Sequence, residues 1–301
     1  MREGHASRTA EYMALFRALE TAAPARARRC EDPLARTFLR PSLAFVASAA
    51  RLPGVGALAT RYIDRRWPGA RTSAVARTRL LDEAVRAAFD EGAEQLVILG
   101  AGFDSRALRL PALRAAQVFE VDHPATQARK RDALASLGGL PAGVRFVATD
   151  FDERDLERAM TEAGFQRARR TLFLWEGVTN YLRAEAVDAT LRWCARAAAG
   201  SQVIFTYVHA NVLAYPDQFF GTERLFATLA AAGEQWTFGL DPAQLADFLA
   251  ARGLRLERDL GAAEYRRLAY GDAAASMRGY EFYRIAVARV TGAAPAAAAA
   301  A

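Results

Sequence analysis

The sequence of 301 residues has little cysteine, histidine and lysine, and the shortage of cysteine excludes two classes of protein. Its two cysteines, Cys30 and Cys194, lie far apart and lack the spacing of metal ligands. This usage argues against a disulfide framework and against a zinc site, so no metal is expected. It also favours a reducing, cytoplasmic location.

Long apolar runs are missing as well. No segment offers about 18 consecutive apolar residues, so we expect no transmembrane helix and no membrane partner. The N-terminus carries charges at Arg2, Glu3, Arg8 and Glu11 and has no apolar core of the kind that secretory signals need. The oligomeric state is left open by the sequence.

The net charge of +6 comes almost entirely from arginine, since Lys130 is the only lysine. Basic runs such as 26–29 and 167–170 are interleaved with alanine and carry no alternating aromatic side chains. A surface on which nucleic-acid bases stack would need such aromatics. We therefore interpret the basic runs as solvated helix faces and turns, and we expect no nucleic-acid partner.

Residues 1–72 are expected to form an N-terminal helical extension. Residues 7–20 have apolar side chains at helical spacing, and Asp32-Pro33 opens a second, short helix. Residues 51–70 contain several prolines and glycines, which predict a loop with a short helix. The sequence pattern changes at Ser73, where a longer amphipathic helix is expected to begin.

From Ser73 onward, short apolar runs alternate with helical stretches. The expected strands are 96–99, 117–122, 145–148, 171–175, 202–208, 254–260 and 280–290, and the expected helices between them are 124–137, 153–163, 183–199 and 242–252. This alternation predicts an α/β fold with a mostly parallel, Rossmann-like sheet and helices on both faces. We expect one domain over 73–292 with a lid or core insertion at about 209–240, followed by a disordered alanine-rich tail at 293–301.

The strongest local motif is a glycine turn after a buried strand, in which Gly100 and Gly102 precede Asp104. Asp122 follows twenty residues after Gly102, at the end of the next strand, where a carboxylate can accept both ribose hydroxyls of an adenosine. A dinucleotide site would want a third glycine where Ser105 stands, and Asp104 would repel a pyrophosphate. The turn therefore favours S-adenosylmethionine over NAD. A turn that binds nothing is the other alternative.

Four ordered motifs contain these residues. They are Arg77-Thr-Arg-Leu-Leu-Asp82, Leu99-Gly-Ala-Gly-Phe-Asp-Ser-Arg106, Glu120-Val-Asp-His-Pro124 and Trp175-Glu-Gly-Val-Thr-Asn-Tyr-Leu182. Together they resemble the leucine carboxyl methyltransferase family, and in particular its bacterial branch of S-adenosylmethionine-dependent methyltransferases. The resemblance runs from about residue 7 to residue 208. It implies the sheet of class I methyltransferases and S-adenosylmethionine as the cofactor, but it does not specify the substrate.

The resemblance also implies roles for the residues around the glycine turn. Arg77 would pair with the carboxylate of the cofactor, a contact that suits its planar guanidinium. Gly100 would line the methionine portion through its backbone, Gly102 would also bind the cofactor, and Asp122 would hold the ribose. A basic residue of the N-terminal helix would also touch the cofactor, and Arg8 is the nearest match.

Further along the chain, the resemblance assigns Asp150 and Phe151 to the adenine. Glu176 would face the methionine ammonium and the reaction centre, and Tyr181 would close the site. Structural alternatives exist for two of these residues: Arg77 is also consistent with an ordinary helix-surface arginine, and Tyr181 with packing between a strand and a helix.

Methyl transfer from a sulfonium is an in-line displacement, so alignment of the reactants supplies much of the acceleration. A carboxylate acceptor is already ionised near neutral pH and needs no base. A phenol or alcohol acceptor would need one, and His209 or Glu176 is then the candidate. We expect a small-molecule or peptide acceptor, chosen by residues 1–72 and 209–240. An NAD-dependent oxidoreductase and a non-catalytic cofactor-binding protein are the competing functions.

Overall fold

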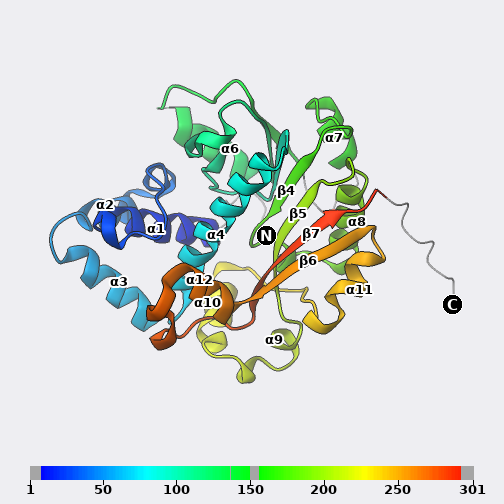
Figure 1. Cartoon of the computed structure of the whole chain (residues 1–301). Coiled ribbons are helices and arrows are strands. Elements are labelled where there is room, and N and C mark those ends of the chain that lie inside the picture. The colour runs from blue at the N-terminus through cyan, green and yellow to red at the C-terminus, as the bar shows by residue number, and fades with distance from the viewer. Residues whose placement is uncertain (1–7, 136, 150–155, 293–301) are drawn as a thin grey trace.

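A single seven-stranded sheet forms the centre of the protein, with the strand order β3-β2-β1-β4-β5-β7-β6 (Figure 1). The computed structural model describes residues 8–135, 137–149 and 156–292. The strands are β1 (Gln95–Leu99), β2 (Gln117–Asp122), β3 (Val144–Ala148), β4 (Thr171–Trp175), β5 (Gln202–Val208), β6 (Leu254–Gly261) and β7 (Tyr283–Val290). The five strands β1–β5 pair in parallel, whereas β7 runs antiparallel between β5 and β6. The prediction of a mostly parallel sheet is confirmed.

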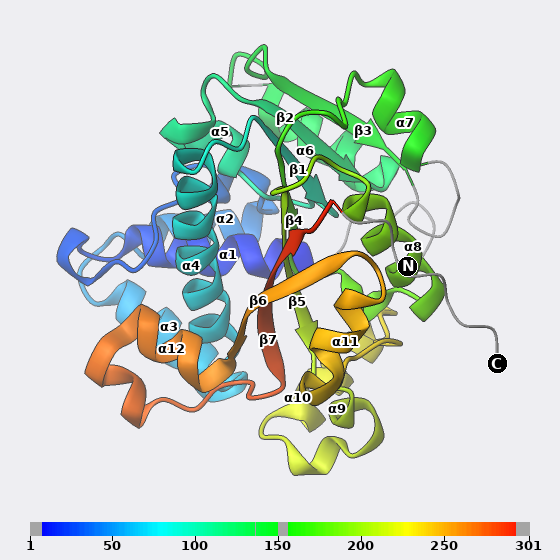
Figure 2. The ribbon, with the colours of Figure 1, turned by 45° about the vertical axis from the view of Figure 1, so that its right-hand side comes forward.

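Helices cover both faces of this sheet. They are α1 (Arg8–Ala22), α2 (Pro41–Ala49), α3 (Val55–Arg66), α4 (Ala70–Asp90), α5 (Arg106–Arg109), α6 (Pro124–Ala135), α7 (Leu156–Glu162), α8 (Ala184–Ala195), α9 (Asn211–Ala214), α10 (Thr222–Ala232), α11 (Leu245–Ala250) and α12 (Ala262–Tyr270). Figure 2 shows α4 and α12 on one side of the sheet and α8 and α11 on the other. This doubly wound arrangement places the carboxyl ends of β1, β2 and β4 at one edge, where open α/β sheets bind ligands.

The alternation of side chains along β1 explains the two layers. All five residues of the strand are buried. Leu96 and Ile98 pack with α4 and α12, and Val97 and Leu99 pack with α8 and α11. Because successive side chains of a strand point to opposite faces, an unbroken apolar run is what a strand covered on both sides requires.

Helices α1–α3 lie together at one side of the molecule (Figure 1) and have a core of their own. This core is joined to the glycine turn through Phe103, whose ring stacks on that of Phe38 at a centroid distance of 5.3 Å. The N-terminal extension therefore packs directly against the part of the sheet where the candidate site is expected.

The expectation of a loop with a short helix over residues 51–70 is confirmed for the helix, but α3 fills twelve of these positions and leaves only short loops at its ends. Pro53-Gly54 and Pro68-Gly69 flank the helix rather than interrupt it, and Gly54 begins it with a φ of 80°. Gly56 lies inside the helix where a Cβ would come within 2.6 Å of the Ala50 carbonyl oxygen. Helix α2 and helix α12, which connects β6 to β7, were not expected from the sequence.

Part of residues 209–240 adds to the core. Val212, Leu229 and Trp236 are buried in a cluster with Phe282, which precedes β7. Tyr215 is the most exposed aromatic side chain of the segment, at 58%. The segment thus contains both core residues and exposed aromatic residues, and the choice between an apolar lid and an extra core helix stays a prediction. The expected tail at 293–301 lies outside the described residues.

Candidate active site

The glycine turn after β1 adopts a conformation that other residues rarely adopt. Gly100 and Gly102 have φ values of 67° and 47°, in the left-handed region. A Cβ on Gly100 would lie 2.3 Å from Cγ2 of Val178, so the position also requires the absence of a side chain. The turn leads into α5, which is only four residues long.

Asp122, at the end of β2, holds this turn in place. Its Oδ2 accepts a hydrogen bond from the backbone N–H of Gly102, and its Oδ1 accepts one from the N–H of His123 at 2.6 Å. Burial raises the pKa of Asp122, and the two backbone donors oppose this shift. An ionised carboxylate accepts about four hydrogen bonds, so about two acceptor positions are left over for a ligand.

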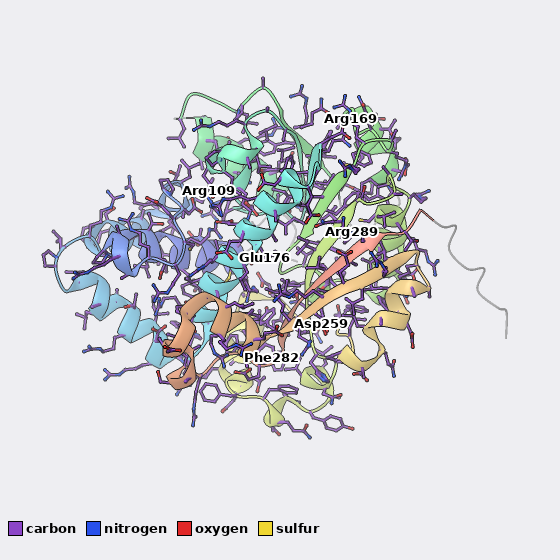
Figure 3. The ribbon with its side chains drawn as sticks, viewed as in Figure 1. Arg109, Arg169, Glu176, Asp259, Phe282 and Arg289 are labelled. Carbon is purple, nitrogen blue, oxygen red and sulfur yellow. The ribbon has the colours of Figure 1, made fainter. Side chains whose placement is uncertain are left out.

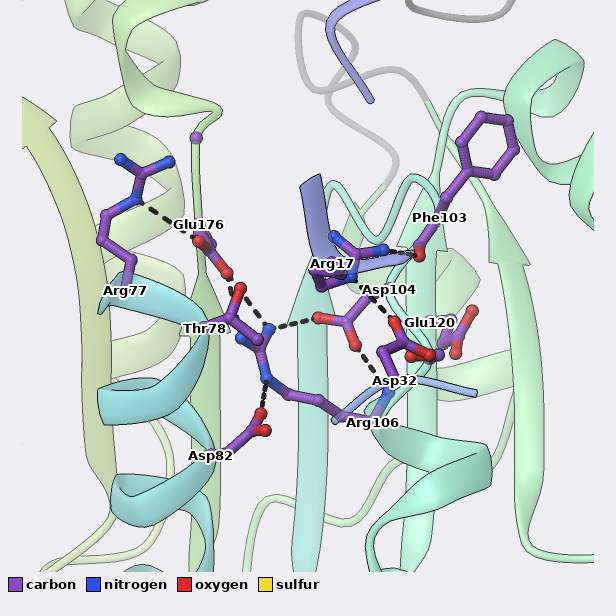
Figure 4. A network of polar contacts seen from close by, with 12 residues as sticks. Arg17, Asp32, Arg77, Thr78, Asp82, Phe103, Asp104, Arg106, Glu120 and Glu176 are labelled. Atoms are coloured by element: carbon purple, nitrogen blue, oxygen red, sulfur yellow. Dashed lines mark hydrogen bonds and ion pairs between the residues drawn. The ribbon is translucent and has the colours of Figure 1, made fainter. Parts of the chain in front are cut away.

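Arg77 and Glu176 form a pair of opposite charges beside the turn (Figure 4). Arg77 comes from α4 and Glu176 follows β4, and Nε of the arginine lies 3.4 Å from Oε1 of the glutamate. Arg77 is 5% exposed; its Nη1 donates to Ser73 Oγ at 2.9 Å, and its guanidinium lies 4.6 Å from the ring centroid of Tyr283. Arg77 is therefore a buried member of the site and not a helix-surface residue.

A second arginine, Arg106, was not singled out from the sequence. Its guanidinium donates to Asp82 Oδ1 at 2.8 Å, to Asp104 Oδ2 at 2.5 Å and to Glu176 Oε2 at 3.1 Å (Figure 4). Burial opposes ionisation of Asp104, but the neighbouring Arg106 and Lys130 overcome this effect and lower its pKa to about 2. Asp104 is therefore ionised, and cations of the protein itself balance its charge. Glu176 lies between Arg106 and Arg77.

Arg109 and Arg17 extend the same network. Arg109 donates to both carboxylate oxygens of Asp82, at 2.6 and 2.7 Å. Arg17 of α1 donates to Asp32 Oδ2 at 2.8 Å and to the Phe103 carbonyl at 2.6 Å. Arg17, a basic residue of the N-terminal helix, thus reaches the turn. The side chain of Arg8 lies outside what the structure describes, so its contact with the cofactor stays a prediction.

The sequence carried a signal for part of this network. Asp82 ends the first of the four motifs, and Asp104 and Arg106 belong to the second. Acids and arginines at fixed motif positions are consistent with ion pairing between motifs. Which acid meets which arginine depends on the packing of α4 against the sheet.

One cavity of about 1310 Å³ brings the candidate residues together. Its wall contains six of the side chains and glycines that the sequence singled out: Arg77, Gly100, Gly102, Asp122, Glu176 and Tyr181. Figure 3 shows Glu176 near the middle of the molecule. Asp150 and Phe151 lie outside the described residues, and Thr149, just before them, lines the cavity.

Tyr181 and His209 differ in their relation to this cavity. Tyr181 lines it and contacts the ring of Trp236, and burial raises the pKa of Tyr181 to about 12. His209 is not part of the described wall. Its Nδ1 accepts the N–H of Asn211 at 3.1 Å, and its ring contacts Phe219 at a centroid distance of 5.9 Å. The structure therefore does not bring His209 to the candidate site.

The two segments expected to choose the acceptor meet at the cavity. Thr9 of α1 donates to Glu234 at 2.5 Å, and Trp67 Nε1 donates to Thr228 of α10 at 3.1 Å. All four residues line the cavity. The N-terminal extension and residues 209–240 thus adjoin each other and both contribute to the wall of one cavity.

Among the described residues, no helix has the length and apolar character needed to cross a membrane. Within the same ranges, no three histidine, cysteine, aspartate or glutamate side chains are grouped so that they could hold a metal ion.

The sequence matches one known protein family over most of its first two thirds. Residues 10–195 match the family described as leucine carboxyl methyltransferase. A "Putative S-adenosyl-L-methionine-dependent methyltransferase" of Mycolicibacterium smegmatis is 44% identical over 130 residues, which are 42% of this chain and 42% of that protein. One of Mycolicibacterium paratuberculosis is 38% identical over 206 residues, 65% of this chain and 62% of that protein. The matched region thus spans about two fifths to three fifths of these relatives.

Solved structures share the fold. A "putative methyltransferase" from Thermobifida fusca superposes with a TM-score of 0.60 at 16% identity and covers 97% of both chains. A protein of the duf574 family from Streptomyces avermitilis gives a TM-score of 0.54 at 18% identity, over 78% of this chain and 90% of that one. At these identities the similarity shows the fold alone, which is the Rossmann-like sheet expected from the sequence.

Proposed function

Because the chain belongs to the leucine carboxyl methyltransferase family, we propose that it uses S-adenosylmethionine to methylate a carboxylate oxygen of a small molecule or peptide. The family match covers more than half of the chain and includes the glycine turn, Asp122 and Glu176. These residues line the cavity described above. The proposal therefore concerns a site whose parts are close together in space.

The residues present fit S-adenosylmethionine. The methionine portion of this molecule carries one ammonium and one carboxylate, and Glu176 and Arg77 offer the complementary charges side by side, 3.4 Å apart. The two glycines let a ligand approach the backbone closely. The spare acceptor positions of Asp122 suit the two ribose hydroxyls of an adenosine.

The same turn suits a dinucleotide poorly. A pyrophosphate is normally bound by the N-terminus of a long helix, whose dipole and free N–H groups favour an anion. Here the helix after the turn, α5, has four residues, and Ser105 at its start is buried at 1% exposure. The negative charge of Asp104 is balanced by Arg106, so the short helix and buried Ser105 are what disfavour a dinucleotide.

The choice of a carboxylate acceptor rests on the state of the titratable groups in the cavity wall. Each described carboxylate there already accepts a hydrogen bond or an ion pair: Asp104, Asp122, Glu176 and Glu234. His123 is the histidine of the described wall, and its Nδ1 accepts the N–H of Ala125 at 3.2 Å. Tyr181, with a pKa of about 12, is protonated at neutral pH. Each of these groups is thus held in a contact of its own, and this arrangement favours an acceptor that is already an anion and needs no general base.

When bound, S-adenosylmethionine supplies a methyl group on a sulfonium: the acceptor oxygen bonds to the methyl carbon, the C–S bonding pair stays on sulfur, and no proton moves. The protein has three tasks in such a transfer. Arg77, Glu176 and Asp122 fix the cofactor, the walls from α1 and α10 hold the acceptor, and the buried tyrosines Tyr181 and Tyr283 keep water away.

The test uses purified protein, methyl-labelled S-adenosylmethionine and a panel of carboxylic acids, phenols and alcohols. We expect labelled product with carboxylic acids only, and we expect mild alkali to release the label because methyl esters hydrolyse readily. Turnover should be nearly flat from about pH 6 to about pH 9, since a carboxylate acceptor has a pKa near 4.

Three other results would contradict the proposal. A label that resists alkali, with a rate that rises through the pKa of a base, would assign a phenol or alcohol acceptor. Binding of NAD but not of S-adenosylhomocysteine would assign an oxidoreductase. Binding of S-adenosylhomocysteine without turnover of any acceptor would point to a cofactor-binding protein.

A further inference from the structure

The cavity continues from the glycine turn into an apolar arm formed by α2 and α3. Its wall there consists of Leu43, Val46, Val55, Leu58, Ala59, Tyr62 and Ile63. No described side chain that these two helices contribute to the wall is charged, although α3 also contains three arginines and an aspartate. Those four side chains lie outside the wall, so the apolar residues of the hairpin are the ones that face the cavity.

This arm is open to solvent. Val46, Leu58 and Tyr62 line the cavity and are nevertheless 37%, 68% and 65% exposed. A group of large apolar side chains exposed on one surface is unusual for a soluble protein and marks a place where an apolar partner binds. Because these side chains also belong to the cavity, the partner is in contact with the site of the glycine turn.

The size of the cavity leaves room for a second ligand. Sites for one small molecule or cofactor occupy about 300–1,000 Å³. The cavity of about 1310 Å³ exceeds this range, so a cofactor against the turn leaves part of it for an acceptor. Trp67, which directly follows α3, donates a hydrogen bond to Thr228 of α10, and both residues line the cavity.

The chemistry of the arm selects among acceptors. The wall from α2 and α3 offers one polar group, the hydroxyl of Tyr62. A peptide lying there would have to bury backbone N–H and C=O groups without partners, which is costly, whereas a hydrocarbon chain has no such groups. Because the arm and the glycine turn belong to one cavity, the carboxylate end of this chain lies toward the turn.

We propose that the acceptor is a carboxylic acid with a long apolar chain, which lies along α2 and α3 while its carboxylate is methylated at the inner end of the cavity. This assignment rests on the proposed function, because it takes the carboxylate as the methylated group. The product is the methyl ester of the acid, formed with no transfer of a proton.

The first experiment measures kcat/KM for straight-chain carboxylic acids of two to sixteen carbons, with labelled S-adenosylmethionine and the full chain. Each CH₂ group that enters an apolar arm should raise kcat/KM about threefold to fourfold, until the arm is filled. Equal values for acetic, octanoic and dodecanoic acid, with methyl esters formed from all three, would overturn the chain assignment and leave the proposed function standing.

The second experiment compares two matched variants, Leu58→Asp and Leu52→Asp. Both leucines are exposed on the α2–α3 hairpin, at 68% and 60%, but only Leu58 belongs to the described cavity wall. We expect Leu58→Asp to lower kcat/KM for dodecanoic acid about tenfold or more, with unchanged binding of S-adenosylhomocysteine. The binding measurement also reports on folding. Leu52→Asp should leave both values unchanged.

The outcomes separate the two proposals. If Leu52→Asp impairs dodecanoic acid as much as Leu58→Asp does, the whole hairpin surface docks a membrane or another chain, and the assignment of the arm to the acceptor is wrong. If no acid gives an alkali-labile product while S-adenosylhomocysteine binds, the proposed function fails and the acceptor assignment fails with it.

Discussion

Replacing Asp122 by asparagine tests the proposed ribose contact with almost no change in side-chain volume. Both carboxylate oxygens of Asp122 already accept backbone hydrogen bonds, from Gly102 and His123. An asparagine side chain has one acceptor oxygen and one NH₂ group. One of the two backbone N–H groups would therefore face another donor, and fewer acceptor positions would be left for a ligand.

The expected magnitude follows from counting acceptor positions. The carboxylate has about four, of which the backbone uses two, so about two remain for the ribose hydroxyls. Asparagine retains about two on its single oxygen, and one of these still serves the backbone. The ribose thus loses roughly one hydrogen bond to a charged group, worth about 1.5–3 kcal/mol. The Kd for S-adenosylhomocysteine should rise about 10- to 100-fold.

Isothermal titration calorimetry with S-adenosylhomocysteine measures this change directly. Asp132→Asn is the matched control, because Asp132 is exposed on α6, is not part of the described cavity wall and undergoes the same loss of charge. The control should bind like the wild type. An Asp122→Asn protein that is folded and binds with wild-type affinity would refute the reasoning, since the ribose would then be held elsewhere.

Two further predictions concern buried charges. Arg106→Gln leaves three carboxylates without their shared cation and should lower the free energy of unfolding by about 3–5 kcal/mol. The control Arg79→Gln, in an exposed pair with Glu83, should lower it by less than about 1 kcal/mol. Equal midpoints of the two variants in urea titrations would contradict this prediction. Burial raises the pKa of Glu120 from 4.5 to about 7, against the opposing effect of Lys130 Nζ at 2.5 Å. The folded state then keeps a proton that the unfolded state releases, so the free energy of unfolding should fall as the pH rises through this interval. Glu120→Gln should flatten that dependence, and a slope equal to that of the wild type would show that another group is responsible.

The sequence by itself determined the sheet and the turn, because both are encoded by neighbouring residues. The apolar run of β1 requires cover on both faces, and Gly100 and Gly102 require a left-handed turn. The position of Asp122 at the end of the next strand follows from the same pattern. The bounds of β4 and β5 agree with the prediction because period, length and flanking turn residues all indicate them.

For helix α3 the sequence predicted a short helix within residues 51–70 but not its bounds. Its flanking prolines and glycines are signals that end a helix as well as signals of a loop. Only the packing of Ile63 into the core of α1–α3 distinguishes the two cases. The place of β7 between β5 and β6 is likewise absent from the sequence pattern, because an apolar run does not specify its neighbours.

The same distinction between local sequence pattern and tertiary packing applies to the candidate site. Arg77 and Glu176 were recognised through their motifs, but their pairing joins residues 99 positions apart, and that of Arg106 with Asp82 joins residues 24 positions apart. The exclusion of His209 from the described cavity wall also depends on how residues 209–240 pack. A motif determines which chemical groups are available. Contacts between distant segments determine which of these charges form pairs, and they also form the arm that extends the cavity along α2 and α3.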